Sequence, residues 1–282
     1  MPFVVPIADA QAEFPQYTFI GALTPSEQKA AFHVQDAAGR HLCLKIIAPS
    51  YDVARIGREI QAMQALQHTN VVRLVEYTFS ATSNKTTHFI LEEFIEGQDL
   101  SAHLTGVAWQ RPRASRFFAA LADGLAAIAA NDLVHRDLKP SNIRVKASGD
   151  PVIIDFGLAR HLRLADLTNT AQGAAPGTPT YFAPEQFTGT KHDIDHRTDL
   201  FAFGVLLYQA LIGPHPFFRV GMTYSQLQAE VCQSVAYKQD AGFVALPAKG
   251  QLLAGKLIAK SRAERPASAA QVATILRNLE AV

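Results

Sequence analysis

Hydrophobic and polar positions alternate through much of the first third of this 282-residue chain. Short runs rich in β-branched and aromatic residues occur at 17–23, 29–36, 41–47, 71–79 and 87–95. Residues 53–66 differ, because their apolar positions recur every three or four residues, which is the spacing of a helix. The pattern therefore predicts an antiparallel sheet that one helix interrupts.

Helical patterns dominate after Gly97, beginning with a helix at about 113–131. The runs "NIRVK" and "PVII" surround the turn "ASGD" and predict a hairpin. A long irregular stretch follows at 156–184, and loops of that length are uncommon unless they are functional. The longest apolar stretches, at 117–130 and 200–213, are shorter than the roughly 20 residues of a membrane span and predict buried helices.

Composition narrows the possible partners and the compartment. The formal net charge of +1 gives no general attraction to nucleic acid or anionic membrane. Cys43 and Cys232 lie far apart among apolar residues, which favours buried free thiols over a disulfide and fits a cytoplasmic protein. The start "MPFVVPIADAQAEF" lacks the basic and long apolar segments of an export signal.

Two charged residues stand at positions that face the predicted core. Glu59 shares a helical stripe with Met63 and Leu66, and Lys45 is the one charged residue in "LCLKII". A carboxylate that faces the core needs a cation, so Lys45 is a candidate partner for Glu59. The alternative is that both side chains point to water.

The segment "HRDLKPSN" at 135–142 is either a solvated turn or part of an active site. Because a hairpin brings its ends together, Asn142 and Asp155 are expected to be neighbours, and Asp137 lies five positions before Asn142. Oxygen ligands of this kind suit Mg²⁺, and a second carboxylate nearby is suited to accept a proton. Such residues also form turns, which is the alternative reading.

The order of the polar motifs along the chain decides that "HRDLKPSN" is part of an active site and not a solvated turn. Lys45, Glu59, "HRDLKPSN", "DFG" at 155–157 and "APE" at 183–185 resemble the signature set of Hanks-type serine/threonine protein kinases, as found in bacteria. The resemblance covers about residues 17–280. It implies an α+β, bilobal protein-kinase-like fold: an N-lobe, residues 1–95, with an antiparallel sheet plus one helix, and a mainly helical C-lobe, residues 96–282.

The resemblance implies ATP-dependent transfer of the γ-phosphate to serine or threonine hydroxyls of protein substrates and of the chain itself. The alternative is a pseudokinase that serves as a scaffold or nucleotide-binding module. Lys45, paired with Glu59, would hold the α- and β-phosphates of ATP. Asp155 and Asn142 would hold Mg²⁺, or Mn²⁺ in its place. Neither a nucleic acid nor a membrane is implied as partner, and the oligomeric state is left open.

The remaining roles also follow from the resemblance. Asp137 would orient the substrate hydroxyl and accept its proton, Lys139 would neutralise charge on the transferring group, and Thr178 would hydrogen-bond the catalytic loop. The long irregular stretch at 156–184 would be the activation segment of the family. Its threonines, Thr168 and Thr170 among them, would pair with Arg136 once phosphorylated. Six further positions match structural residues of the family: His135, Phe156, Met63, Asp199, Glu185 and Arg265.

Two stretches depart from the family pattern. Where kinases carry a glycine-rich loop, this chain has "IGALTPSEQKAAF", in which only Gly21 remains. Either ATP binds more loosely there, or side chains such as Ser26 and Lys29 replace backbone contacts. In "FILEEFIEG", Glu92 takes the place of an apolar residue behind adenine, and Glu93 and Ile95 fall at the hinge. Glu92 needs a partner there, unless a shift of one residue points it outward.

Overall fold

The computed structural model describes residues 1–26, 29–48, 57–82, 85–155, 179–188 and 193–280, and the side chains of 57–59, 80–82, 85–86 and 280 lie outside the description. Two compact units divide the chain. The first takes its described residues from Met1–His68 and Val72–Glu96, and the second takes them from Thr69–Val71 and from Gly97 onward. The expected combination of an antiparallel sheet and a mainly helical part is confirmed.

The first unit is built on a five-stranded antiparallel sheet with the order β1-β2-β3-β5-β4. Its strands are β1 Thr18–Ala22, β2 Lys29–Gln35, β3 His41–Ile47, β4 Leu74–Thr82 and β5 Lys85–Glu93. All five overlap the runs expected from the alternating pattern, although β4 begins and ends three residues later than its run, and β5 begins and ends two residues earlier. Strands β3 and β5 are central, so each has a hydrogen-bonded neighbour on both sides.

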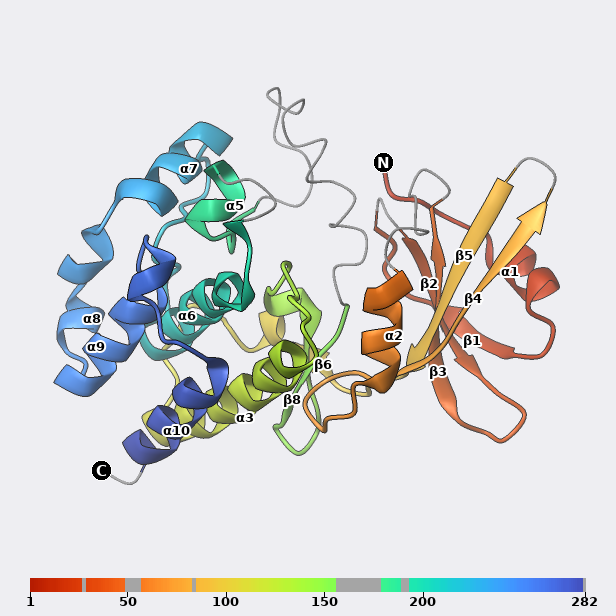
Figure 1. Ribbon diagram of the computed structural model, residues 1–282, viewed down its shortest axis with the longest axis horizontal. Helices are drawn as coiled ribbons and strands as arrows, with labels where there is room; N and C mark the ends of the chain where they lie inside the picture. Colours follow the sequence, from red (N-terminus) through yellow and green to blue (C-terminus); the bar gives the residue numbers. More distant parts are fainter. Residues whose placement is uncertain (27–28, 49–56, 83–84, 156–178, 189–192, 281–282) are drawn as a thin grey trace. The chain divides into compact units, whose positions relative to one another are not determined.

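One face of this sheet is covered by the start of the chain. Leu42, Leu44 and Ile46 alternate along β3 and join a core that includes Ala10 and Phe14. These two residues lie in and just after α1 (Ile7–Glu13), which Figure 1 shows in red beside the sheet. The sequence pattern did not predict α1, because seven residues with prolines close by give too short a periodic signal.

Helix α2 (Gly57–Ala65) is the predicted helix between β3 and β4. Ile60 and Met63 on its described part and Leu66 just beyond it are each 3% exposed, which confirms the apolar stripe. The start of the expected helix, up to residue 56, lies outside the described residues.

The second unit combines a small sheet with helices. Its three strands, in the order β6-β7-β8, are Gln98–Asp99, Ile143–Val145 and Pro151–Ile153. Its described α-helices are α3 Arg111–Ala130, α5 Pro184–Thr188, α6 His196–Ile212, α7 Tyr224–Gln233, α8 Ala241–Val244, α9 Ala248–Leu257 and α10 Ala269–Glu280. Four 3₁₀ turns complete its described part: η2 Leu100–Ala102, η3 Pro140–Asn142, η5 Ala236–Gln239 and η6 Arg262–Glu264. Helices α3 and α10 run side by side (Figure 1).

Helix α6 forms the centre of this unit. Its residues are apolar on all sides and most of them are buried, as expected for a helix inside a core. Gly204 lets α9 approach closely, because a Cβ there would lie 2.6 Å from the Cβ of Leu257. The two predicted apolar helices are therefore α3 and α6, both packed inside the unit.

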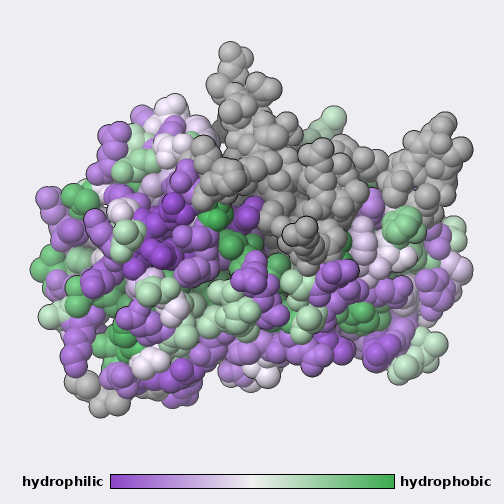
Figure 2. Space-filling view, in the orientation of Figure 1, coloured by the Kyte–Doolittle hydropathy of each residue, from purple (hydrophilic) through white to green (hydrophobic). Residues whose placement is uncertain are grey.

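The described surface is mixed in character. On the face shown in Figure 2, hydrophobic residues are scattered among hydrophilic ones outside the grey region. Within the described part of the chain, no helix is both long and apolar enough to cross a bilayer. Cys43 and Cys232 are free thiols as predicted, but both are half-buried rather than buried.

Candidate active site

The segment His135–Asn142 reaches β7 as an irregular loop, and α6 holds its start. Asp199, in the first turn of α6, accepts hydrogen bonds from the backbone N–H groups of His135 (2.7 Å, Oδ2) and Arg136 (2.8 Å, Oδ1). Asp199 is only 4% exposed, and burial raises the pKa of its carboxyl against the opposing effect of these donors. The expected anchoring role of Asp199 is confirmed by this geometry.

Arg136 is held in a backbone conformation that most residues avoid, with φ of 63°. Its N–H is bound by Asp199, and its carbonyl oxygen accepts a hydrogen bond from the side-chain amide of Gln186 (3.0 Å). Gln186 was not among the residues predicted from the sequence, although it directly follows the "APE" motif and its amide offers both a donor and an acceptor. The surrounding structure thus fixes a strained residue one position before Asp137.

His135 is fully buried, as expected for a scaffold residue. Its Nε2 lies 3.0 Å from the carbonyl oxygen of Ile154, and its Nδ1 accepts from the backbone N–H of Asp137 (3.3 Å). In these contacts Nε2 faces an acceptor and Nδ1 faces a donor. His135 therefore ties the loop to the strand that ends beside Asp155.

Asp137 is the point on which the polar side chains of the loop converge. Lys139 donates from Nζ to Asp137 Oδ2 (2.9 Å). Asn142 donates from Nδ2 to the carbonyl oxygen of Asp137 (2.8 Å) and to Oδ2 (3.3 Å). These three residues of the "HRDLKPSN" segment are therefore in direct contact, and Asn142 turns its amide nitrogen toward Asp137.

The hairpin brings its two ends together as predicted. Ile143 pairs with Ile153, and the backbone N–H of Ile154 donates to the carbonyl oxygen of Asn142 (2.9 Å). Asp155 follows at once, with φ of 60°, a region where aspartate is tolerated better than most residues. This hydrogen bond therefore joins Asn142 to the residue directly before Asp155, at the end of the small sheet.

Asn142 and Asp155 carry oxygen ligands of the kind that Mg²⁺ uses in proteins. Because the amide nitrogen of Asn142 is bound to Asp137, its amide oxygen is the atom left to bind a metal. Mg²⁺ needs only one or two carboxylates when phosphates supply other oxygens. Among the described residues, no group of three or more His, Cys, Asp or Glu side chains is placed to hold a metal ion. The donor set fits a cation that arrives with phosphates.

The "APE" glutamate forms the expected buried ion pair. Glu185, in α5, accepts two hydrogen bonds from Arg265 (2.7 and 2.8 Å) and a third from the hydroxyl of Thr198 (2.8 Å). The pair fastens α5 to α6 and to the segment before α10. Thr178 and Phe156, like Thr168 and Thr170, lie outside the described residues.

In the first unit, Lys45 is 5% exposed, so the alternative in which it points to water is wrong. Its Nζ forms an ion pair with Glu92, which is 3% exposed. Glu92 thus faces inward and has the partner that its depth requires. The side chain of Glu59, the partner expected from the helical stripe, lies outside the description.

The stretch that replaces the glycine-rich loop is anchored within the first unit. Ser26 accepts from the backbone N–H of Phe3 (2.7 Å) through its carbonyl oxygen and from that of Lys29 (3.2 Å) through its hydroxyl. Gly21 lies in β1 next to a register shift, and a side chain there would meet nothing within 4 Å. The hydroxyl of Ser26 therefore takes part in closing its own turn.

At the end of β5, Glu93 donates its backbone N–H to the carbonyl oxygen of Arg73 (3.1 Å), and Phe94 donates to that of His41 (3.1 Å). Ile95 is 8% exposed. These contacts fix the strand end where adenine contacts were predicted from Glu93 and Ile95.

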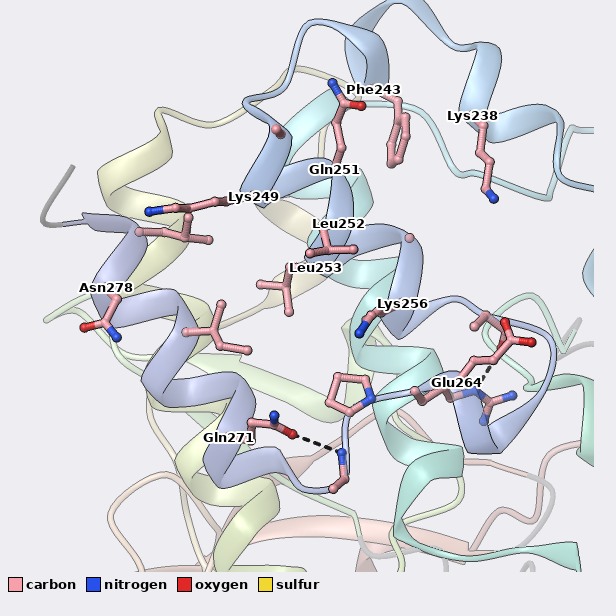
Figure 3. Close-up of a pocket in the computed structure, with 18 of the residues that line it drawn as sticks. Lys238, Phe243, Lys249, Gln251, Leu252, Leu253, Lys256, Glu264, Gln271 and Asn278 are labelled. Carbon is pink, nitrogen blue, oxygen red and sulfur yellow. Dashed lines mark hydrogen bonds between the residues drawn. The ribbon is translucent and has the colours of Figure 1, made fainter.

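A cavity of about 1120 Å³ lies elsewhere in the second unit, between α9, η6 and α10 (Figure 3). Leu252, Leu253 and Phe243 supply apolar lining, and Lys238, Lys249 and Lys256 lie around them (Figure 3). None of the catalytic or ligand-binding residues predicted from the sequence lines this cavity.

Comparison with known proteins decides the family. Residues 29–275 match the model of the protein kinase domain. The chain belongs to the protein kinase family. It is 36% identical over 192 residues to the serine/threonine-protein kinase pkn2 of Myxococcus xanthus, covering 65% of this chain and 22% of that protein.

Two further relatives agree. The chain is 32% identical over 238 residues to the serine/threonine-protein kinase pkn3 of Myxococcus xanthus, covering 79% of this chain and 41% of the relative. It is 34% identical over 166 residues to the serine/threonine-protein kinase PknB of Mycobacterium leprae, covering 58% and 26%. The chain spans less than half the length of these relatives. Protein kinases generally use ATP and Mg²⁺.

Proposed function

We propose that this chain is a serine/threonine protein kinase that transfers the γ-phosphate of ATP to hydroxyls of proteins and of itself. The observation that carries the proposal is the convergence of Lys139 and Asn142 on Asp137 within a loop that Asp199 anchors. The names of its relatives favour phosphate transfer over the pseudokinase alternative.

In the proposed reaction the oxygen of a substrate hydroxyl bonds to the γ-phosphorus while the bond from phosphorus to the β,γ-bridging oxygen breaks, which releases ADP. Asp137 orients the hydroxyl and receives its proton. Lys139 stands beside the same carboxylate and offsets negative charge on the transferring group. Thr178 would hydrogen-bond this loop.

Each unit would contribute its own groups to nucleotide binding. In the first, Lys45 would bind the α- and β-phosphates, with Glu59 as a partner, and Glu93 and Ile95 would meet adenine through their backbone. Gly21 and the turn at Ser26 would cover the phosphates. In the second, Asn142 and Asp155 would hold Mg²⁺ or Mn²⁺, which neutralises phosphate charge when it is bound.

The proposal is tested by following γ-phosphate transfer from labelled ATP to a generic basic protein and to the chain itself, with Mg²⁺ and with Mn²⁺. We expect Asp137→Asn to lower kcat by about 10²- to 10⁴-fold, the usual contribution of a general base. Asp150→Asn is the matched control, because Asp150 is an exposed acid in the turn of the neighbouring hairpin. Absence of transfer by the unaltered chain with either metal would refute the proposal.

A further inference from the structure

Glu92 is an acid at a position where the family pattern has an apolar residue, so that pattern does not explain its presence beside Lys45. It stands on the central strand β5, opposite Cys43, while Lys45 stands opposite Ile90. Residues paired in this way point to the same face, so Lys45 and Glu92 are diagonal neighbours on one face of the sheet. A diagonal spacing is within reach of long side chains, and the two form an ion pair.

Burial limits what this carboxylate can do. Both partners are almost completely removed from water. If Lys45 left Glu92 to bind phosphate, a buried charge would remain without its counter-charge, which is strongly unfavourable. A lysine ammonium has three N–H donors, so a bond to Glu92 does not by itself prevent a bond to another oxygen. Lys45 can therefore bind a phosphate oxygen and keep Glu92 at the same time.

The strand pair makes Glu92 a suitable anchor. Both β3 and β5 are hydrogen-bonded on two sides, and their register is continuous from Leu42–Glu93 to Ile46–Phe89. The position of Glu92 relative to the backbone of Lys45 is thus set by the sheet itself. An anchor of this kind directs the ammonium from within the sheet.

We propose that Glu92 is a positioning residue that holds the ammonium of Lys45, through the β3–β5 pair, where the phosphates of ATP bind. This inference rests on the proposed function for the identity of the nucleotide. It assigns a role to an acid at a position where the family pattern has an apolar residue, and it adds a contact within the sheet to those that orient Lys45.

The test compares three substitutions that separate charge from shape: Glu92→Leu, Glu92→Gln and Glu92→Asp. Steady-state kinetics give kcat and KM for ATP and, separately, KM for the protein substrate. Affinity for a fluorescent ATP analogue and the thermal shift caused by ATP are measured alongside, so that a destabilised variant still gives a readout. Glu76→Gln is the control, because Glu76 is an exposed acid on the adjacent strand β4.

We expect Glu92→Leu to lower kcat/KM for ATP by about 10- to 100-fold, the usual effect of a misplaced binding group, and to leave KM for the protein substrate unchanged. Glu92→Asp should recover part of the loss, and Glu92→Gln should recover less. ATP parameters within about twofold of the unaltered chain in all three variants would show a merely structural role. Tighter ATP binding by Glu92→Leu would show that Glu92 keeps the ammonium of Lys45 away from the phosphates, and would overturn the proposal.

The two proposals fail separately. If the unaltered chain binds ATP but transfers no phosphate, the proposed function is wrong, while weaker nucleotide binding by Glu92→Leu would still support the positioning role. If the unaltered chain is active and the Glu92 variants bind ATP normally, only the positioning role is wrong.

Discussion

Removing the carboxylate of Glu185 should destabilise the second unit strongly. Arg265 has a side chain that is 0% exposed, and Glu185 is its only acidic partner among the described residues. Its other acceptors are the backbone carbonyl oxygens of Ala259 (2.9 Å), Arg197 (2.9 Å) and Lys260 (3.2 Å). In Glu185→Ala the guanidinium would stay buried against these carbonyls without a counter-charge.

The expected cost is about 3–5 kcal/mol in the free energy of unfolding, the range found when one partner of a buried pair is removed. Thr198 would also lose the acceptor of its hydroxyl. A typical domain has only about 5–15 kcal/mol of stability, so the loss is a large share of the total. The double variant Glu185→Leu with Arg265→Met should be more stable than Glu185→Ala, because it leaves no buried charge.

The measurement is urea denaturation followed by circular dichroism, with Glu264→Gln as the control because Glu264 is an exposed acid in the adjacent turn η6. The control should change stability by less than about 0.5 kcal/mol. A cost below about 1 kcal/mol for Glu185→Ala would refute the reasoning. So would a double variant that is no more stable than Glu185→Ala, since the cost would then not come from the unpaired arginine.

Two further predictions concern stability. Burial lowers the pKa of His215 to about 3, so the unfolded chain binds a proton below its ordinary pKa of 6.5 while the folded chain does not. The chain should lose up to about 2 kcal/mol between about pH 6.5 and 5, and urea titrations at both pH values should show a smaller loss in His215→Gln. Phe14→Ala should cost about 3 kcal/mol, because Phe14 is 7% exposed and its ring centroid lies 4.6 Å from that of Phe89. Thermal melting of Phe79→Ala, at a site 61% exposed, is the comparison, and equal melting temperatures would contradict the assignment of the N-terminal segment to the core.

Sequence periodicity was sufficient for the sheet and the hairpin, because their residues are close in the chain and alternate clearly. The hairpin alone placed Asn142 next to Asp155. Periodicity was insufficient to predict α1, because this helix is short and is stabilised by packing Ala10 and Phe14 on the sheet. The contribution of Gln186 was also out of reach, since its amide meets the carbonyl of Arg136, which is 50 positions away in the chain.

The partners of Lys45 show the same limit. Helical spacing predicted Glu59, and this pairing stays a prediction because the side chain of Glu59 lies outside the description. A buried lysine also pairs with any other carboxylate that the fold brings into reach. Only the register of β3 with β5 shows that Glu92, 47 positions away, is such a carboxylate. Residue types in order therefore identify the chemistry of this family, while long-range pairing decides which side chains direct it. Asp199, which binds the backbone just before Asp137, and Glu92, which pairs with Lys45, are both buried acids that distant parts of the sequence bring to these positions.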